Sequence, residues 1–289
     1  MSGGTVPAPG PAAGHPATHP RRAGRNLPAA FAVGLGLGAV ILVSLLVARG
    51  AFLGIVVLAA LVGVWELSTA LATAGTRVPL VPVGVGATAM LVGAWVGGAE
   101  LLVVSLGLTV LAVLIWRLPQ GAQGFVRDAT AGVFVTGYVP LLGSFVVLLL
   151  VPADGAMRVV AFLVGVIASD TGGYAAGVLA GRHPMAPSIS PKKSWEGFGG
   201  SVVASAVAGW LTVSYALEGD WWVGVVLGCA TALVATLGDL SESLVKRDLG
   251  IKDMGSLLPG HGGLMDRLDS ILMAAPVAWL ILDVLVPVS

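Results

Sequence analysis

The sequence predicts an all-α, polytopic integral membrane protein with about nine transmembrane helices and a functional site in its cytosolic loops. Of the 289 residues, 56% are hydrophobic and 10% are charged, and the mean hydropathy is +0.96. This composition is typical of membrane proteins. The 15 basic and 15 acidic residues give no net charge, but they lie between the long apolar runs rather than inside them. The placement of charge is therefore more informative than its sum.

The chain begins with a segment that cannot form a core. Residues 1–26 consist largely of Gly, Pro, Ala and His, and they end in the basic residues Arg21, Arg22 and Arg25. Such a composition predicts a disordered cytosolic tail. A cleaved signal peptide fits less well, because the apolar run that follows is about 20 residues long and further runs follow it.

The apolar runs set the number of spans. A helix needs about 20 apolar residues to cross a hydrocarbon core of about 30 Å. The fourth run is short, and little more than Arg49 and Gly50 separates the first two, so eight spans remain an alternative to nine. We expect an N-terminal transmembrane region (27–156) and a C-terminal region (157–289) that carries the candidate catalytic loops. The nine predicted spans are 27–47, 51–71, 78–96, 101–115, 129–151, 157–180, 198–216, 221–237 and 270–286.

The orientation follows from the excess of Lys and Arg in cytosolic loops. With nine spans and the tail inside, only Arg49 and Arg158 fall in outer loops. This strong bias favours nine spans over eight and places the charged loops on the cytosolic side. The inner basic residues are Arg21, Arg22, Arg25, Arg77, Arg117, Arg127, Arg182, Lys192, Lys193, Lys246, Arg247, Lys252 and Arg267.

The first unusual inner segment follows the sixth span. Asp170 lies inside an apolar helix, where an ionisable residue is costly and must face protein, water or a cation. Further on, Lys192 and Lys193 place two cations at the membrane surface. Such a pair alone is often a topology signal or attracts anionic lipid headgroups. The nearby glycines are explained most simply by close helix packing.

The second unusual segment is the loop 238–270, in which about a third of the residues are charged. On a helix, Asp239, Glu242 and Lys246 share one face, and Asp266 and Asp269 share another. Carboxylates without Cys or paired His suit Mg²⁺, and the interleaved Lys and Arg side chains suit phosphate oxygens. A solvated, salt-bridged loop remains the alternative on these grounds alone. The single cysteine, Cys229, excludes an internal disulfide and a Cys-rich metal cluster.

At this point the residues resemble a known family. The 27 residues from Ser243 to Asp269 are similar to the signature S-x-x-K-R-x4-K-D-x-G-x2-L-P-x-H-G-G-x-x-D-R-x-D of phosphatidate cytidylyltransferases, or CDP-diacylglycerol synthases. A pattern with so many fixed positions is highly specific. The segments S-D-T-G-G-Y and S-P-K-K-S-W-E-G also resemble this family. The matching residues of the signature are Ser243, Lys246, Arg247, Lys252, Asp253, Gly255, Leu258, Pro259, His261, Gly262, Gly263, Asp266, Arg267 and Asp269.

The resemblance implies an enzyme that transfers CMP from CTP to phosphatidate, giving CDP-diacylglycerol and pyrophosphate. It also implies a requirement for Mg²⁺ with K⁺ as a second cation, a homodimer, and a site facing the cytoplasm of the cell membrane. We expect no nucleic-acid partner. By position, the family's metal-binding aspartates correspond to Asp239, Asp266 and Asp269.

We assign the remaining charged residues to the reaction as a hypothesis. Lys246 and Arg267 join the aspartates as catalytic residues, and Asp170 is a supporting acid at the substrate site. His261 either donates to a phosphate oxygen or caps backbone groups. The residues expected at the substrates are Lys192, Lys193, Ser243, Arg247, Lys252, His261 and Asp170.

Two alternative functions remain open. A CTP-dependent lipid kinase, such as a polyprenol kinase, would use the γ rather than the α phosphorus of CTP. An ion or solute transporter would use Asp170 and Glu66 as ligands within the membrane. Glu66, in the second predicted span, has no role in the transferase hypothesis.

Overall fold

The computed structural model describes residues 27–255, 257 and 262–288, with side chains from residue 36 onward. The predicted disordered tail lies outside the described residues. The helices are α1 (Leu27–Val47), α2 (Arg49–Thr73), α3 (Leu80–Arg117), α4 (Phe125–Thr136), α5 (Leu142–Leu150), α6 (Gly155–Ala180), α7 (Trp195–Ala216), α8 (Trp221–Asp248) and α9 (Met265–Leu285). A 3₁₀ turn (Leu118–Gln120), a π-helical turn (Gly137–Leu141) and the strands β1 (Pro184–Ala186) and β2 (Ser190–Ser194) complete the elements.

The predicted all-α, polytopic membrane architecture is confirmed, but the helix count differs. Within the described part of the chain, seven helices are long and apolar enough to cross a membrane. One of them, residues 80–120, contains two of the predicted spans. The first predicted span is α1, which is 21 residues long; only its stretch Gly38–Val47 falls within the residues counted here, where it is a shorter apolar helix. These two differences account for seven rather than nine.

The segment 80–120 folds back on itself at two glycines. Gly98 has φ +62° and ψ −151°, a conformation that side-chain-bearing residues rarely adopt, and Gly97 is also non-helical. Beyond the turn the two arms pack closely, because a Cβ atom at Gly86 would lie only 2.2 Å from the side chain of Thr109. The predicted spans 78–96 and 101–115 correspond to these two arms.

The boundaries of the last two helices correct the predicted loop 238–270. The helix α8 continues to Asp248, well beyond the predicted end at residue 237, and α9 begins at Met265 rather than at residue 270. The connection is therefore only 249–264. Hydropathy indicates which residues lie in lipid and does not indicate where a helix ends. A span predicted from hydropathy therefore stops where the sequence becomes charged, even if the helix continues.

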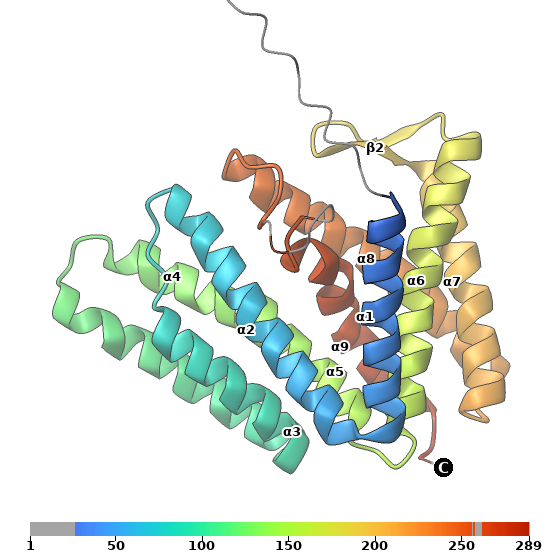
Figure 1. Cartoon of the computed structure of the whole chain (residues 1–289), viewed down its shortest axis with the longest axis horizontal. Coiled ribbons are helices and arrows are strands. Elements are labelled where there is room, and N and C mark those ends of the chain that lie inside the picture. The colour runs from blue at the N-terminus through green and yellow to red at the C-terminus, as the bar shows by residue number, and fades with distance from the viewer. Residues whose placement is uncertain (1–26, 256, 258–261, 289) are drawn as a thin grey trace, which may run out of the picture.

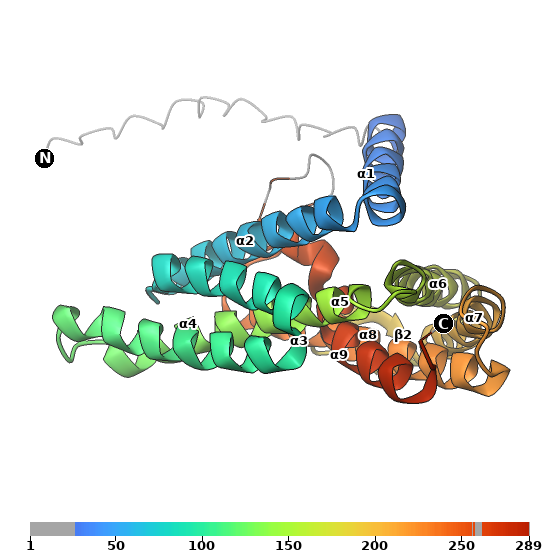
Figure 2. The ribbon, with the colours of Figure 1, turned by 90° about the horizontal axis from the view of Figure 1, so that it is seen from below.

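The helices form two groups joined by α9 (Figure 1). The helices α6, α7 and α8 pack in succession, and α9 packs against α8, α5 and α6. Small residues permit this closeness: a Cβ atom at Gly172 would lie 2.7 Å from the carbonyl oxygen of Gly200, and one at Gly209 would lie 2.1 Å from that of Gly224. Figure 2 shows α2, α3 and α4 on the side of the molecule away from α6 and α7.

A short antiparallel hairpin, β1–β2, was not predicted. It connects α6 to α7 and stands at the opposite end of the bundle from the C-terminus (Figure 1). Glu196 stabilises the base of the hairpin, because Oε2 of Glu196 accepts hydrogen bonds from the backbone amides of Arg182 (3.1 Å) and His183 (3.2 Å). The hairpin carries Lys192 and Lys193, so it brings both cations to the end of α8.

Candidate active site

A cavity of about 550 Å³ lies where α6, the hairpin, the end of α8 and the start of α9 meet. Its walls come from segments that are up to about 100 positions apart in the sequence. Eight of the predicted site residues line it, so the structure brings together most of the side chains that the sequence singled out. These eight are Asp170, Lys192, Lys193, Asp239, Lys246, Asp266, Arg267 and Asp269.

The last turns of α8 supply one wall. Because Asp239, Glu242 and Lys246 are spaced by three and four residues, they project from the same face of this helix. The Nζ atom of Lys246 lies 2.5 Å from Oε2 of Glu242. Glu242 itself is almost fully buried, and its Oε1 has no hydrogen-bond partner among the described residues. A buried carboxylate oxygen without a partner is unusual in proteins, and here it belongs to a residue that lines the cavity.

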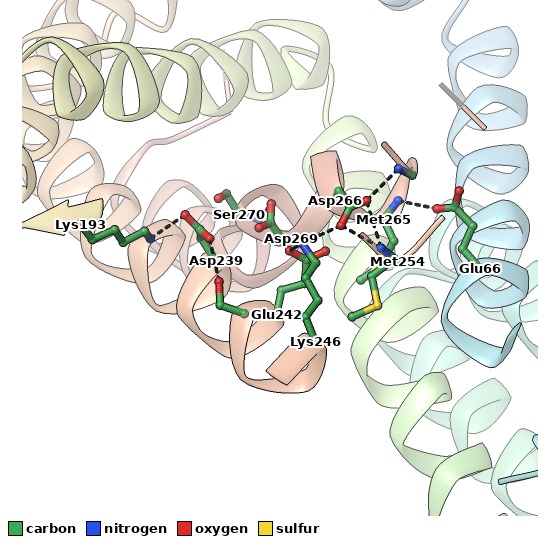
Figure 3. A network of polar contacts seen from close by, with 12 residues as sticks. Glu66, Lys193, Asp239, Glu242, Lys246, Met254, Met265, Asp266, Asp269 and Ser270 are labelled. Atoms are coloured by element: carbon green, nitrogen blue, oxygen red, sulfur yellow. Dashed lines mark hydrogen bonds and ion pairs between the residues drawn. The ribbon is translucent and has the colours of Figure 1, made fainter. Parts of the chain in front are cut away.

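Asp266, in the first turn of α9, is held by the loop that precedes it. Its Oδ2 accepts a hydrogen bond from the backbone amide of Gly263 at 2.7 Å, and both of its oxygens lie 3.2 Å from the amide of Met254. Gly262 has φ +83°, which lets the chain turn tightly around this carboxylate. The Nζ atom of Lys246 also contacts this carboxylate, at 2.6 Å from Oδ1 of Asp266. Figure 3 shows these contacts as one continuous network.

Asp269 and Asp239 face the same space from different helices. Asp269 is one turn further along α9 and is 8% exposed, with its Oδ1 2.7 Å from the amide of Ser270. Asp239 is more open, with 41% of its side chain exposed, and it pairs with Lys193 of the hairpin at 2.6 Å. Lys193 of the hairpin thus forms an ion pair with Asp239 of α8 (Figure 3).

Three predicted substrate residues, Ser243, Arg247 and Lys252, are not among the described residues that line the cavity. The hydroxyl of Ser243 donates to Oδ1 of Asp239 at 3.4 Å, and Nε of Arg247 donates to the carbonyl oxygen of Ile189 at 3.3 Å. Arg247 therefore ties the hairpin to α8 in this arrangement. Lys252 is exposed, and His261 lies outside the described residues. The roles predicted for these three residues and for His261 remain predictions.

The sequence reasoning left out three acidic residues that the structure places at or beside the site. Glu242 and Asp253 line the cavity. The helical spacing of Glu242 and the place of Asp253 in the signature were signals that could have identified them. Glu66 contacts the start of α9 from α2; a carboxylate inside an apolar span was a signal for this residue, but nothing local in the sequence indicated its partner.

The charge of the cavity determines what it can bind. Its described lining contains six carboxylates and four basic side chains, which leaves a formal excess of two negative charges. An anionic ligand would therefore bind here most easily together with added cations. Among the residues described, no three Asp, Glu, His or Cys side chains converge as a ready-made metal site. Asp239 and Asp266 are instead paired with Lys193 and Lys246, so the predicted metal ligands stay a prediction.

Comparisons with known proteins show the family to which the chain belongs. Residues 29–285 match the family model described as the cytidylyltransferase family. The chain is 45% identical to the phosphatidate cytidylyltransferase of Mycobacterium bovis, over 96% of each chain. It is also 45% identical to that of Mycobacterium leprae, over 91% of this chain and 90% of the other. The protein of the same name from Helicobacter pylori is 42% identical over 47% of this chain and 51% of its own. The chain belongs to the cytidylyltransferase family.

Proposed function

We infer that the protein is a phosphatidate cytidylyltransferase, which transfers CMP from CTP to phosphatidate and releases pyrophosphate. The observation that carries this inference is that Lys193, Asp239, Lys246 and Asp266 meet in one cavity. Lys193, Lys246 and Asp266 belong to segments that resemble the family, and relatives of that name share 45% identity over nearly the full chain. CDP-diacylglycerol is a precursor in phospholipid biosynthesis, so the product fits a membrane enzyme.

The main chemical difficulty is to bring two polyanions together. The phosphomonoester of phosphatidate has a second pKa of about 6, so its attacking oxygen is largely deprotonated at neutral pH and needs no general base. Rate enhancement must then come from positioning and from positive charge near the phosphates. Lys192 and Arg267 line the cavity with exposed side chains, and Lys193 and Lys246 lie beside carboxylates. These four side chains are our candidates for contacting phosphate oxygens.

The donor set suits a magnesium ion. The described cavity side chains that could bind a metal are carboxylates, and the hard Mg²⁺ ion prefers such oxygens together with substrate phosphates. We assign Asp239, Asp266 and Asp269 to it, with K⁺ as a second cation, and Glu242 offers a further unpaired oxygen. A bound divalent cation would supply the positive charge that the cavity lacks. Lys193 and Lys246 form ion pairs with Asp239 and Asp266 in the cavity.

The position of the cavity suits a lipid substrate. Phosphatidate keeps its acyl chains in the bilayer while its phosphate lies at the interface, where CTP arrives from water. The cavity lies at the end of the bundle that carries the hairpin and Lys192, which the distribution of basic residues assigns to the cytosol. We therefore propose nine spans, with both arms of α3 counted, and a site facing the cytoplasm of the cell membrane. A homodimer is a further prediction from the resemblance.

The test is to incubate the purified protein in detergent with phosphatidate, Mg²⁺ and CTP labelled at the α phosphorus. A cytidylyltransferase places this label in the lipid product, whereas a CTP-dependent kinase places only a γ label there. Label from the γ position in lipid, or no lipid label from either CTP, would contradict the proposal. The Asp266→Asn variant, prepared in parallel, controls for a contaminating activity.

A further inference from the structure

Glu66 of α2 reaches the start of α9 across the molecule. Its Oε2 accepts a hydrogen bond from the backbone amide of Met265 at 2.8 Å, although the two residues are 199 positions apart in the sequence. Met265 is the first residue of α9, and both partners are buried, Glu66 at 1% and Met265 at 0% exposure. Figure 3 shows Glu66 approaching from the side opposite to Lys193.

The loop before α9 is shaped to the Glu66 side chain. A Cβ atom at Gly255 would lie 2.2 Å from Oε1 of Glu66, and one at Gly263 would lie 2.8 Å from its Oε2. Neither glycine has a positive φ, so backbone conformation does not require glycine at these positions. Glycine is required because the Glu66 side chain occupies space into which a Cβ atom would project. The carboxylate of Glu66 on a distant helix thus explains Gly255, and together with the backbone nitrogen of Gly255, 2.7 Å from a Cβ atom at Gly263, it explains Gly263.

The charge of Glu66 is placed where a helix can compensate it. The first amides of an α-helix lack partners within the helix, and its N-terminus carries a partial positive charge that stabilises an anion. Two carboxylates accept hydrogen bonds from backbone amides at and before the start of α9. Glu66 accepts from Met265, and Asp266 accepts from Gly263 and Met254. The start of α9 cannot move relative to α2 without breaking the bond to Glu66.

We propose that Glu66 is a positioning residue for cytidylyl transfer: it fixes the first turn of α9, and with it Asp266 and Asp269, against α2. Glu66 is not among the residues that line the cavity, so it acts through α9 rather than on the substrates. This inference rests on the proposed function and deepens it. The signature alone places the site in the C-terminal half of the chain. With Glu66, the N-terminal half also contributes a residue that positions it.

The first test compares two substitutions at the same position. Glu66→Ala removes the acceptor, and loss of a group that orients an active-site residue typically lowers activity roughly 10- to 100-fold. We expect this loss in kcat, with the KM for CTP unchanged. Glu66→Gln keeps an oxygen acceptor for the Met265 amide and should restore most of the activity. Glu100→Ala, which removes an exposed carboxylate, is the control and should be neutral.

Two outcomes would overturn the proposal. One is near-native kcat in Glu66→Ala, and the other is an equal loss in Glu66→Gln and Glu66→Ala. If Glu66→Ala does not fold, Glu66→Asp takes its place. Its side chain is one methylene shorter and withdraws the oxygen from Met265, so it should also lower kcat, and a native kcat would again count against the role.

The second test uses the steric fit between Glu66 and Gly255. Gly255→Ala should lower activity in the wild-type background because its methyl group meets the carboxylate. In the Glu66→Ala background the same change should cost much less, a coupling that a double-mutant cycle measures. Gly54→Ala is the matched control, since Gly54 lies on α2 with no other group within 4 Å of its would-be Cβ atom. Additive losses at Glu66 and Gly255 would contradict the fit.

A readout independent of activity separates this inference from the proposed function. Hydrogen–deuterium exchange of the detergent-solubilised protein should be faster at residues 263–268 in Glu66→Ala than in wild type and Glu66→Gln. If the wild-type protein transfers no CMP yet this difference appears, the proposed function fails and the contact stands. If the wild type is active and the exchange is unchanged, the contact does not fix α9 and the inference fails.

Discussion

Lys246 and Asp266 join the last two membrane helices at the cavity: Nζ of Lys246 on α8 lies 2.6 Å from Oδ1 of Asp266 on α9. The same nitrogen lies 2.5 Å from Oε2 of Glu242, so one cation serves two largely buried carboxylates. Removing one member of a buried charge cluster is costly, because the remaining charges lose their partner. This arrangement makes Lys246 important for stability.

Lys246→Met should therefore lower the free energy of unfolding by about 3–5 kcal/mol, the range for breaking a buried ion pair. This loss of stability is measured by thermal unfolding in detergent, with the disappearance of the monodisperse species as the signal. Adding Glu242→Gln to Lys246→Met removes one of the unpaired charges and should recover part of the loss. A double variant less stable than Lys246→Met would contradict this account.

Asp266→Asn should abolish cytidylyl transfer while leaving expression and membrane insertion near normal. The carboxylate accepts bonds from Met254, Gly263 and Lys246, and an amide of the same shape has one acceptor oxygen fewer and no charge. Lipid product formed from α-labelled CTP is the measurement. Asp283→Asn, an exposed site at the far end of α9, should keep full activity. Near-native transfer by Asp266→Asn would remove Asp266 from the metal and catalytic roles.

Lys193 and Lys252 should differ in their effect on substrate binding. Lys193 lines the cavity and pairs with Asp239, whereas Lys252 is exposed and does not line it. A hydrogen bond to a charged group contributes about 1.5–3 kcal/mol, so Lys193→Met should weaken substrate binding about 10-fold or more. Lys252→Met should change the KM values much less. Initial rates at varied CTP and phosphatidate decide this, and equal effects would show that Lys252 also reaches a substrate.

Removal of divalent cations should stop the reaction. Because the cavity has an excess of carboxylates, two polyanionic substrates need added positive charge there. Chelation with EDTA should abolish transfer, and excess Mg²⁺ should restore it. Asp269→Asn should raise the Mg²⁺ concentration required for half-maximal rate, while Asp283→Asn should not. Full activity in EDTA would refute the role of the metal.

Arg158 should matter for stability at the end of the bundle away from the cavity. Its guanidinium pairs with Asp154 at 2.8 Å and donates to the carbonyl oxygens of Leu282 and Val286 at 2.6 and 2.8 Å. These carbonyls lie at the end of α9, where a cation is favourable. Arg158→Leu leaves Asp154 without this partner and should cost about 3–5 kcal/mol of stability. Arg127→Leu, at a half-exposed site, should cost far less in the same unfolding measurement.

Much of the architecture was predictable because its signals are local. The length of an apolar run reflects the thickness of the bilayer, so α6 and α7 were placed to within three residues of their bounds. The charges near the end of α8 and the start of α9, together with the loop signature, also pointed to residues that line the cavity. Hydropathy alone, however, could not show that α8 continues as a helix to Asp248 or that residues 184–194 form a hairpin. Both features are set by backbone hydrogen bonds and by contacts with other segments.

By itself, the sequence determined the class of protein, its family, and eight side chains that meet in one cavity. Only the tertiary structure decided how those side chains pair and what holds them. The contact of Glu66 with Met265, the tie of Arg247 to Ile189, and the joining of Lys193 to Asp239 link residues 199, 58 and 46 positions apart. Composition and periodicity describe neighbours along a helix. Contacts at such separations arise only when the helices pack, and no local pattern encodes them.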